Sequence, residues 1–303
     1  MSAAASAPPP PSAPVASASA SARAVSPPPS CTPSGTTACL RGAQLEDAAL
    51  LLSRLHERPI VILGVHPVRL TGAIGGDSAK KAFDSLVDAA NDRKVLVDHF
   101  ALDGAEWLAP WSITRERPSP KSTGVPGCAE KIDVSFVRAK VVRGLLRLNA
   151  DLNRLTVDAP ESLVEVGDMT VVGRGVDLCL LLSHAIELGG GRLRVKGKKL
   201  AVDGGHLPSR GEPDAPSCPD EGPPLTAAAL PCFPIAELEV TAIGGAGERR
   251  LALVRSRHGR TAFSRSVPVR VGSHVGLEQM RVESIGDDGL HGEGARVVPL
   301  APE

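Results

Sequence analysis

The stretch IDVSFVRAKVVRGLLRLNADLNRLTVD, residues 132–158, decides the predicted fold because its hydrophobic spacing changes twice. Residues Ile132–Val137 alternate between apolar and polar side chains, which is typical of a half-buried strand. Apolar residues then recur at helical spacing at Val141, Leu145, Leu148 and Leu152. A short apolar run, Leu155–Asp158, follows. The stretch therefore predicts a strand, a helix and a second strand.

The next residues extend this pattern to a complete α/β module. A strand is expected from Leu163 to Val172, and a second helix is indicated by the apolar stripe Leu178, Leu181, Leu182 and Ala185. Three glycines beginning at Gly189 end that helix. A hairpin is predicted from Arg192–Val195 and Lys199–Val202, with Gly197 in its turn.

The same order of periods occurs earlier in the chain, at a constant offset of 96 residues. Apolar residues match apolar residues over about fifty positions, and examples are Leu52 with Leu148 and Val61 with Val157. We therefore expect two modules that superpose, with both of these pairs buried. In the first module, Asp77 is the expected N-cap of the second helix.

Changes in composition give the domain boundaries. Runs rich in proline and glycine separate the modules from each other and from a C-terminal region with short strand-like runs and no helical stripe. The fold class is α+β, with two repeated βαββαβ-type modules followed by a small antiparallel all-β sandwich or barrel. The predicted parts are a tether at 1–36, module 1 at 37–111, a linker at 112–130, module 2 at 131–204, a linker at 205–230 and a β domain at 231–303.

Composition excludes some classes of function. Lys plus Arg and Asp plus Glu are equal at 34 each, and aromatic residues make up only 2% of the 303 residues. Such a chain lacks the basic field and the stacking rings that nucleic-acid binding requires. No apolar run is long enough to span a membrane, and no export signal is visible. Membrane attachment is therefore expected only through an anchor that is not visible in this sequence.

Catalytic, cofactor and metal motifs are absent from the sequence. His56-Glu57 is not followed by the second histidine of a zinc motif, and the glycines at 244–247 precede no helix pattern. His184 falls beside an apolar helix stripe, where a satisfied or surface histidine is expected rather than a ligand. We predict a protein that is not an enzyme and that has no cofactor.

The six cysteines are compatible with disulfides in an oxidising compartment. A bond between Cys218 and Cys232 would tie the second linker to the β domain, and the competing pairing joins Cys31 or Cys39 to Cys128. Cys179 lies inside a helical stripe and is expected to be a buried free thiol.

Module 2 resembles the short N-terminal domain of secretins and TonB-dependent receptors. The segments that carry this resemblance are Val134–Ala139, Leu145–Leu148, Leu155–Asp158, Leu178–Leu182 and Lys198–Val202. Module 1 looks like a more diverged copy. The family's glycine before the third strand is replaced in module 2 by Glu161-Ser162.

The C-terminal region is similar to the periplasmic domain of the PilP family of type IV pilus proteins and to the GspC homology region of type II secretion. Its most specific element is Val271-Gly272-Ser273-His274-Val275-Gly276, in which Ser273 replaces the usual acidic residue. Further carrying segments are Ala252–Val254 and Val282–Ile285. These families are scaffolds, so the resemblance implies an envelope assembly role and supplies no catalytic residue.

Together these features predict a periplasmic scaffold of a type IV pilus or type II secretion-like machine, either free or tethered to a membrane. It would link a secretin to inner-membrane components. The alternative is a periplasmic module that binds peptidoglycan or a small ligand. The candidate partner-binding residues are two basic or apolar strand edges and two tryptophans, namely Arg194, Lys196, Lys198, Lys199, Val269, Val271, Trp107 and Trp111.

Overall fold

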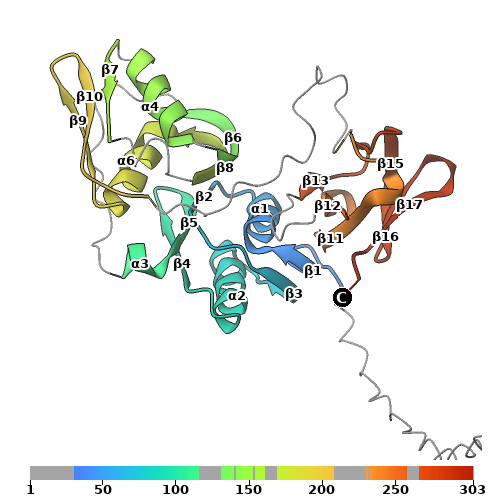
Figure 1. Ribbon diagram of the computed structural model, residues 1–303. Helices are drawn as coiled ribbons and strands as arrows, with labels where there is room; N and C mark the ends of the chain where they lie inside the picture. The colour runs from blue at the N-terminus through green and yellow to red at the C-terminus, as the bar shows by residue number, and fades with distance from the viewer. Residues whose placement is uncertain are drawn as a thin grey trace, which may run out of the picture. The chain divides into compact units, whose positions relative to one another are not determined.

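A computed structural model describes residues 31–115, 131–139, 141–152, 154–160, 169–207, 230, 232–257 and 266–302. The structure is mixed α+β, as the sequence predicts, with helices in the first two thirds and strands throughout (Figure 1). Contacts group Cys31–Glu303 into one compact unit. No helix in the described ranges is both long and apolar enough to cross a membrane.

The N-terminal segment alternates strands and helices. Its elements are β1 (Thr37–Gln44), α1 (Leu45–Leu55), β2 (Ile60–Leu63), β3 (Arg69–Gly75), α2 (Ala79–Asp92), β4 (Val97–Leu102), β5 (Ala105–Pro110) and α3 (Trp111–Thr114). Strand β1 pairs antiparallel with β3, β2 pairs parallel with β5, and β4 pairs antiparallel with β5. The N-cap of α2 is Ser78, whose side chain accepts a hydrogen bond from the Lys81 N–H, so the prediction of Asp77 as the cap is wrong by one residue.

The middle segment has a corresponding set of elements. They are β6 (Lys131–Ala139), α4 (Val141–Leu152), β7 (Thr156–Asp158), β8 (Met169–Asp177), α6 (Leu178–Leu188), β9 (Arg192–Lys196) and β10 (Lys199–Asp203). Strand β6 pairs antiparallel with β8, β7 pairs parallel with β10, and β9 pairs antiparallel with β10. Asp177 caps α6 by accepting from the Leu180 N–H, which starts that helix where its apolar stripe begins.

The C-terminal segment contains strands and single 3-10 turns over its described residues. They are η1 (Ile235–Glu237), β11 (Leu238–Gly244), η2 (Gly247–Arg249), β12 (Leu251–Ser256), β13 (Val267–Val269), β14 (His274–Val275), β15 (Met280–Ile285), β16 (Gly289–Gly292), η3 (Glu293–Ala295) and β17 (Arg296–Pro299). Strands β14 to β17 form an antiparallel sheet in chain order. Their short, alternating runs agree with the expected all-β character of this segment.

Two of the sheets join strands from different segments. One five-stranded sheet has the order β13-β12-β11-β1-β3, and it is formed where β1 pairs antiparallel with β11. The other has the order β4-β5-β2-β8-β6 and is formed where β2 pairs antiparallel with β8. Strand pairing between segments was not expected from the sequence, which predicts a separate sheet for each module.

Strand β2 separates two hydrophobic cores. Ile60 and Ile62 belong to one cluster, with α1 and α2, whereas Val61 and Leu63 belong to another, with α4 and α6. Because successive side chains of a strand point to opposite faces, a strand covered on both faces is apolar throughout. The sequence IVIL of β2 therefore follows from its position between two helical layers.

The sequence repeat predicts that the paired residues of the two modules are both buried, and the structure describes three of these four side chains. Leu52 and Val61 are fully buried, as predicted, but Val157 is 37% exposed in the short edge strand β7. The expectation that Val61 and Val157 are both buried is therefore wrong. Leu148 lies in α4, and its side chain falls outside the described part of the structure.

Candidate functional site

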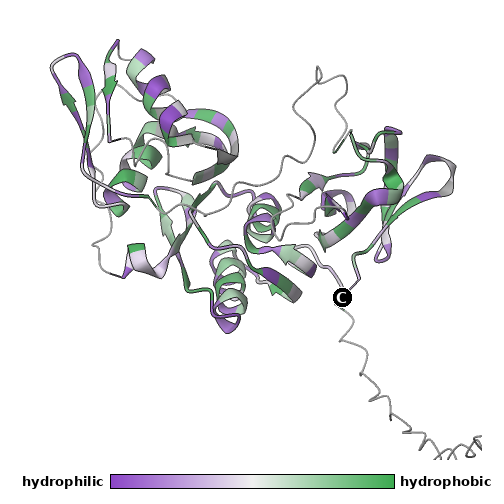
Figure 2. Ribbon diagram, in the orientation of Figure 1, coloured by the Kyte–Doolittle hydropathy of each residue, from purple (hydrophilic) through white to green (hydrophobic). Residues whose placement is uncertain are grey.

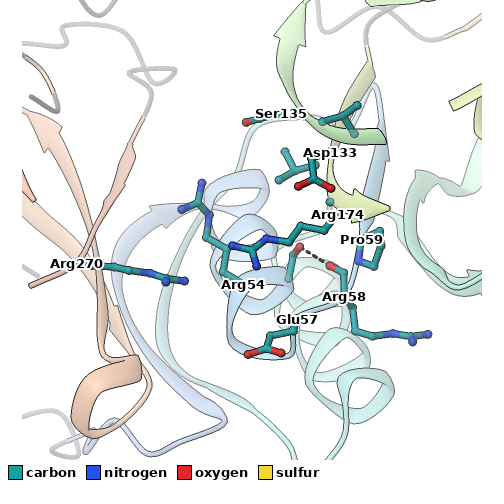
Figure 3. A pocket seen from close by; sticks show the side chains of 12 residues that line it. Arg54, Glu57, Arg58, Pro59, Asp133, Ser135, Arg174 and Arg270 are labelled. Carbon is teal, nitrogen blue, oxygen red and sulfur yellow. Dashed lines mark hydrogen bonds between the residues drawn. The ribbon is translucent and has the colours of Figure 1, made fainter. Parts of the chain in front are cut away.

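A cavity of about 590 Å³ opens beside the C-terminal end of α1. Its walls come from the turn between α1 and β2, from β6 and β8, and from Arg270 just beyond β13 (Figure 3). Four arginines and two acids supply its charged lining, namely Arg54, Arg58, Arg174, Arg270, Glu57 and Asp133. Residues far apart in the sequence thus meet at one hollow.

Local packing explains why β8 can approach the turn before β2. A Cβ atom added at Gly173 would lie 2.6 Å from the Pro59 Cβ, so a larger side chain would push the strand away. The turn itself is held by Ser53, whose hydroxyl donates to the Arg58 carbonyl oxygen at 2.6 Å. Arg54 lines the cavity and is the one residue of α1 that is not buried.

Three of the charged residues in the lining have another partner among the described residues. Arg58 Nε lies 3.3 Å from Glu106 Oε1, Glu57 is 3.7 Å from Arg249, and Asp133 accepts a hydrogen bond from the Gly175 N–H at 2.9 Å. Figure 3 shows Arg58 extending away from the other arginines.

Arg54, Arg174 and Arg270 have no ion pair with any residue that the structure describes. Burial lowers the pKa of Arg54, and the positive charge of Arg270 lowers that pKa further. Among the described residues, the cavity therefore contains three guanidinium groups, those of Arg54, Arg174 and Arg270, that have no carboxylate partner.

A second cluster surrounds His99 on β4. Its Nδ1 lies 2.9 Å from Asp84 Oδ1, and its Nε2 lies 2.9 Å from Glu106 Oε2. The ring stacks on Phe83 with centroids 5.2 Å apart, and only 3% of the side chain is exposed. Both ring nitrogens are occupied by carboxylates, so neither is available to take a proton from a substrate.

Burial and charge act in opposite directions on this cluster. Burial by itself would lower the pKa of His99, but the hydrogen bonds and charges of Glu106 and Asp84 outweigh it, and the pKa is raised. For Glu106, burial would raise the pKa, but His99 and Arg58 outweigh it and lower the pKa. The arrangement favours a protonated imidazole between two carboxylates, which is a structural ion cluster.

His184 on α6 is fully buried, so of the two expected alternatives it is the histidine with a partner and not the surface one. Its Nε2 lies 2.5 Å from Asp103 Oδ2, and its ring meets the edge of Trp107 with centroids 6.2 Å apart. The Nδ1 atom has no hydrogen-bond partner within the described ranges. Over those same residues, no group of three or more His, Cys, Asp and Glu could hold a metal ion.

The predicted basic strand edge is partly correct. Strand β9 is an edge of the sheet β7-β10-β9, but β10 is the central strand, so the prediction that Lys199–Val202 forms an edge is wrong. Figure 2 shows hydrophilic residues around the turn of this hairpin.

Three basic side chains of this hairpin form ion pairs within the chain. Arg194 and Lys196 both pair with Asp203, at 3.8 and 2.6 Å, and Lys199 pairs with Asp158 at 3.4 Å. Lys198 lies in the turn, where its carbonyl oxygen accepts from the Thr156 N–H. Local neutralisation weakens the case for these residues as a steering surface for an acidic partner.

Two of the other candidate partner-binding side chains are buried. The sequence allowed Trp107 either to cap the core of the first module or to be an exposed partner anchor, and it is fully buried, although in the core beside α4 and α6. Val269 is also fully buried, whereas Val271 is 53% exposed and follows the end of β13. Trp111 is half-buried, and the Arg115 guanidinium lies 4.9 Å from its ring centroid. Val271 alone of these four is well exposed.

The cysteines correct two expectations. Cys31 and Cys39 are bonded to each other, which contradicts the alternative in which either pairs with Cys128. Cys179 is disulfide-bonded and is not the free thiol that its helical position suggested. Cys232 is also disulfide-bonded, but Cys218 lies outside the described residues, so their pairing stays a prediction.

No protein-family model matches this sequence, and no curated protein and no solved structure is detectably similar to it. The resemblances described above therefore remain expectations. The arginine cavity was not predicted, because Arg54, Arg174 and Arg270 come from distant positions in the chain and share no local motif. Only the folding of α1, β8 and the residue after β13 brings them together.

Proposed function

We propose that this chain is a non-enzymatic scaffold of a bacterial envelope machine, of the type IV pilus or type II secretion kind. It would connect a secretin to inner-membrane components in the periplasm. We further propose that its first two segments are copies of one repeated module, as the sequence offset indicates.

The pairing of the strands is the observation that supports the repeated module and, through it, the proposed scaffold. In the N-terminal segment, β1 pairs with β3, and β5 lies between β2 and β4. In the middle segment, β6 pairs with β8, and β10 lies between β7 and β9. Strand directions also correspond, since β2–β5 and β7–β10 are both parallel and the other pairs are antiparallel. The shared scheme supports a duplicated module with the element order of the short secretin domain.

Open sheet edges offer a way to bind proteins without a catalytic group. Among the described strands, β9 and β13 each pair on one side only. Such an edge can accept an extended segment of a partner through main-chain hydrogen bonds. Strand β9 carries charged side chains, and charges on an edge strand limit its uncontrolled pairing with other chains. These edges support a role in protein association.

The cysteine chemistry supports an oxidising compartment. The Cys31–Cys39 bond and the bonded states of Cys179 and Cys232 involve thiols that a reducing cytoplasm would keep free. The periplasm is the compartment in which such bonds and a secretin partner occur together, so we place the protein there.

Strand addition at β9 can be tested by removing one backbone donor. Gly197 and Lys198 form a two-residue turn, so Lys196 and Lys199 are a hydrogen-bonded pair and Val195 is not hydrogen-bonded to β10. The N–H of Val195 then points to the open edge. Val195→Pro should abolish capture of a secretin's periplasmic region from envelope extract by the full chain, whereas Val195→Thr should retain capture because it keeps the N–H.

Equal capture by Val195→Pro and by the unchanged chain would reject β9 as the docking edge. Recovery of no envelope-machine protein by the unchanged chain, together with tight retention of isolated cell wall, would reject the scaffold proposal. That second result would favour a module that binds peptidoglycan.

A further inference from the structure

We propose that the arginine-lined cavity beside α1 binds a compact polyanion, a small ligand that carries at least two phosphate or carboxylate groups. The inference concerns the cavity alone and does not depend on the proposed scaffold function. It names a site that no motif in the sequence indicates.

The charge of the cavity favours an anionic ligand. Arg54, Arg174 and Arg270 line it without an ion pair to any residue in the described part of the chain. Like charges that share a hollow repel one another more strongly than charges in bulk water. The two acids of the lining offset this repulsion only in part, because they stand against four arginines and Glu57 also lies 3.7 Å from Arg249. A bound anion would convert the repulsion into attraction.

The geometry suits a ligand with more than one anionic group. Figure 3 shows Arg174 and Arg270 extending from opposite sides toward Arg54. Each guanidinium can bind one carboxylate or phosphate through two parallel hydrogen bonds. Because the three side chains come from α1, from β8 and from the residue after β13, they surround the hollow rather than follow one strand.

The size of the cavity favours a small molecule. Its volume of about 590 Å³ falls within the range of roughly 300–1,000 Å³ that is typical of small-ligand sites. Both phosphate esters and carboxylates present the same oxyanion chemistry to guanidinium groups. The experiment therefore uses one probe of each kind.

Binding is measured by isothermal titration calorimetry on the full chain at low salt, with pyrophosphate as the phosphate probe and citrate as the carboxylate probe. We expect at least one probe to bind with a Kd below about 1 mM, and the affinity to fall as salt is added. Arg54→Gln and Arg270→Gln should each weaken that binding at least tenfold. Arg281→Gln, which changes an exposed arginine on β15 away from the cavity lining, should leave it unchanged.

Thermal unfolding separates a binding role from a structural role. In the absence of probe, Arg54→Gln should leave the unfolding temperature unchanged or raise it, because the substitution removes one of several like charges. The rise in unfolding temperature caused by the bound probe should be lost. Arg174→Gln, on an exposed position of β8, provides a second variant that does not depend on the packing of α1.

Tighter binding of pyrophosphate would assign the site to a phosphate ligand, and tighter binding of citrate would assign it to a polycarboxylate. The proposal is overturned if neither probe binds with a Kd below about 1 mM, or if Arg281→Gln weakens binding as much as Arg54→Gln does. Binding of a glutamate-rich peptide without binding of either small probe would also overturn it, in favour of protein docking at this surface.

Discussion

The fold changes the protonation of His99, because two carboxylates flank a nearly buried ring. Its pKa is raised above 6.5, so its stabilising effect is complete below about pH 6.5 and is lost as the pH rises through the raised value. The lowered pKa values of Glu106 and Asp84 add stability that is complete above about pH 4.5 and is lost as the pH falls. We expect this cluster to contribute most between about pH 4.5 and 6.5.

His99→Gln should lower the free energy of unfolding at pH 5.5 by about 1.5–3 kcal/mol, the usual contribution of a hydrogen bond to a charged group. The difference between the variant and the unchanged chain should shrink as the pH rises to 8.5. Denaturant unfolding across this range measures both effects. His274→Gln is the matched control, since His274 is exposed, and an equal pH dependence of the two variants would contradict the assignment.

Leu182 tests the core at the same scale. Its side chain is 1% exposed, which confirms the burial expected from the apolar stripe of α6. Leu182→Ala should cost about 2–5 kcal/mol in denaturant unfolding, because buried apolar contacts are lost and a cavity remains. Leu277→Ala, at a position that is 61% exposed, should change stability by less than about 0.5 kcal/mol. A small effect at Leu182 would show that α6 does not pack as described.

At the scale of elements, the Cys31–Cys39 bond holds the start of strand β1. The two cysteines are eight residues apart, and Cys39 pairs with both β3 and β11. Replacing both by serine should reduce the free energy of unfolding by about 2.5 kcal/mol, the chain-entropy value for a loop of that length. Peptide mapping of the oxidised protein without reductant checks the pairing, and a peptide that joins Cys31 to Cys128 would disagree with it.

Helix α1 connects the three segments of the whole molecule. Its Glu46 accepts a hydrogen bond from the Thr170 hydroxyl on β8, and its Asp47 accepts from the Ser266 N–H just before β13 at 3.1 Å. Ala242, Leu251 and Leu253 from the C-terminal segment join the core cluster of α1 and α2. The segments therefore share a core as well as sheets.

This sharing predicts one cooperative unfolding transition for residues 31–303, measured by circular dichroism and by tryptophan fluorescence in parallel. The isolated fragment 231–303 should be much less stable than the same residues in the full chain, because β11 would lose β1 and expose an apolar edge. A fragment that unfolds cooperatively at the midpoint of the full chain would show that the C-terminal segment is an independent domain.

The sequence by itself determined the mixed α+β class, the positions of the main helices and the burial of residues such as Leu52 and Leu182, because hydrophobic periodicity is a local property. The tertiary structure decided which strands pair across segments, and it buried every residue of α1 except Arg54. An apolar stripe predicts that one face of a helix is buried. The other faces of α1 are buried by residues about 200 positions away in the chain, such as Ala242 and Leu253. The arginine cavity has the same origin, since long-range packing alone brings Arg54, Arg174 and Arg270 to one place.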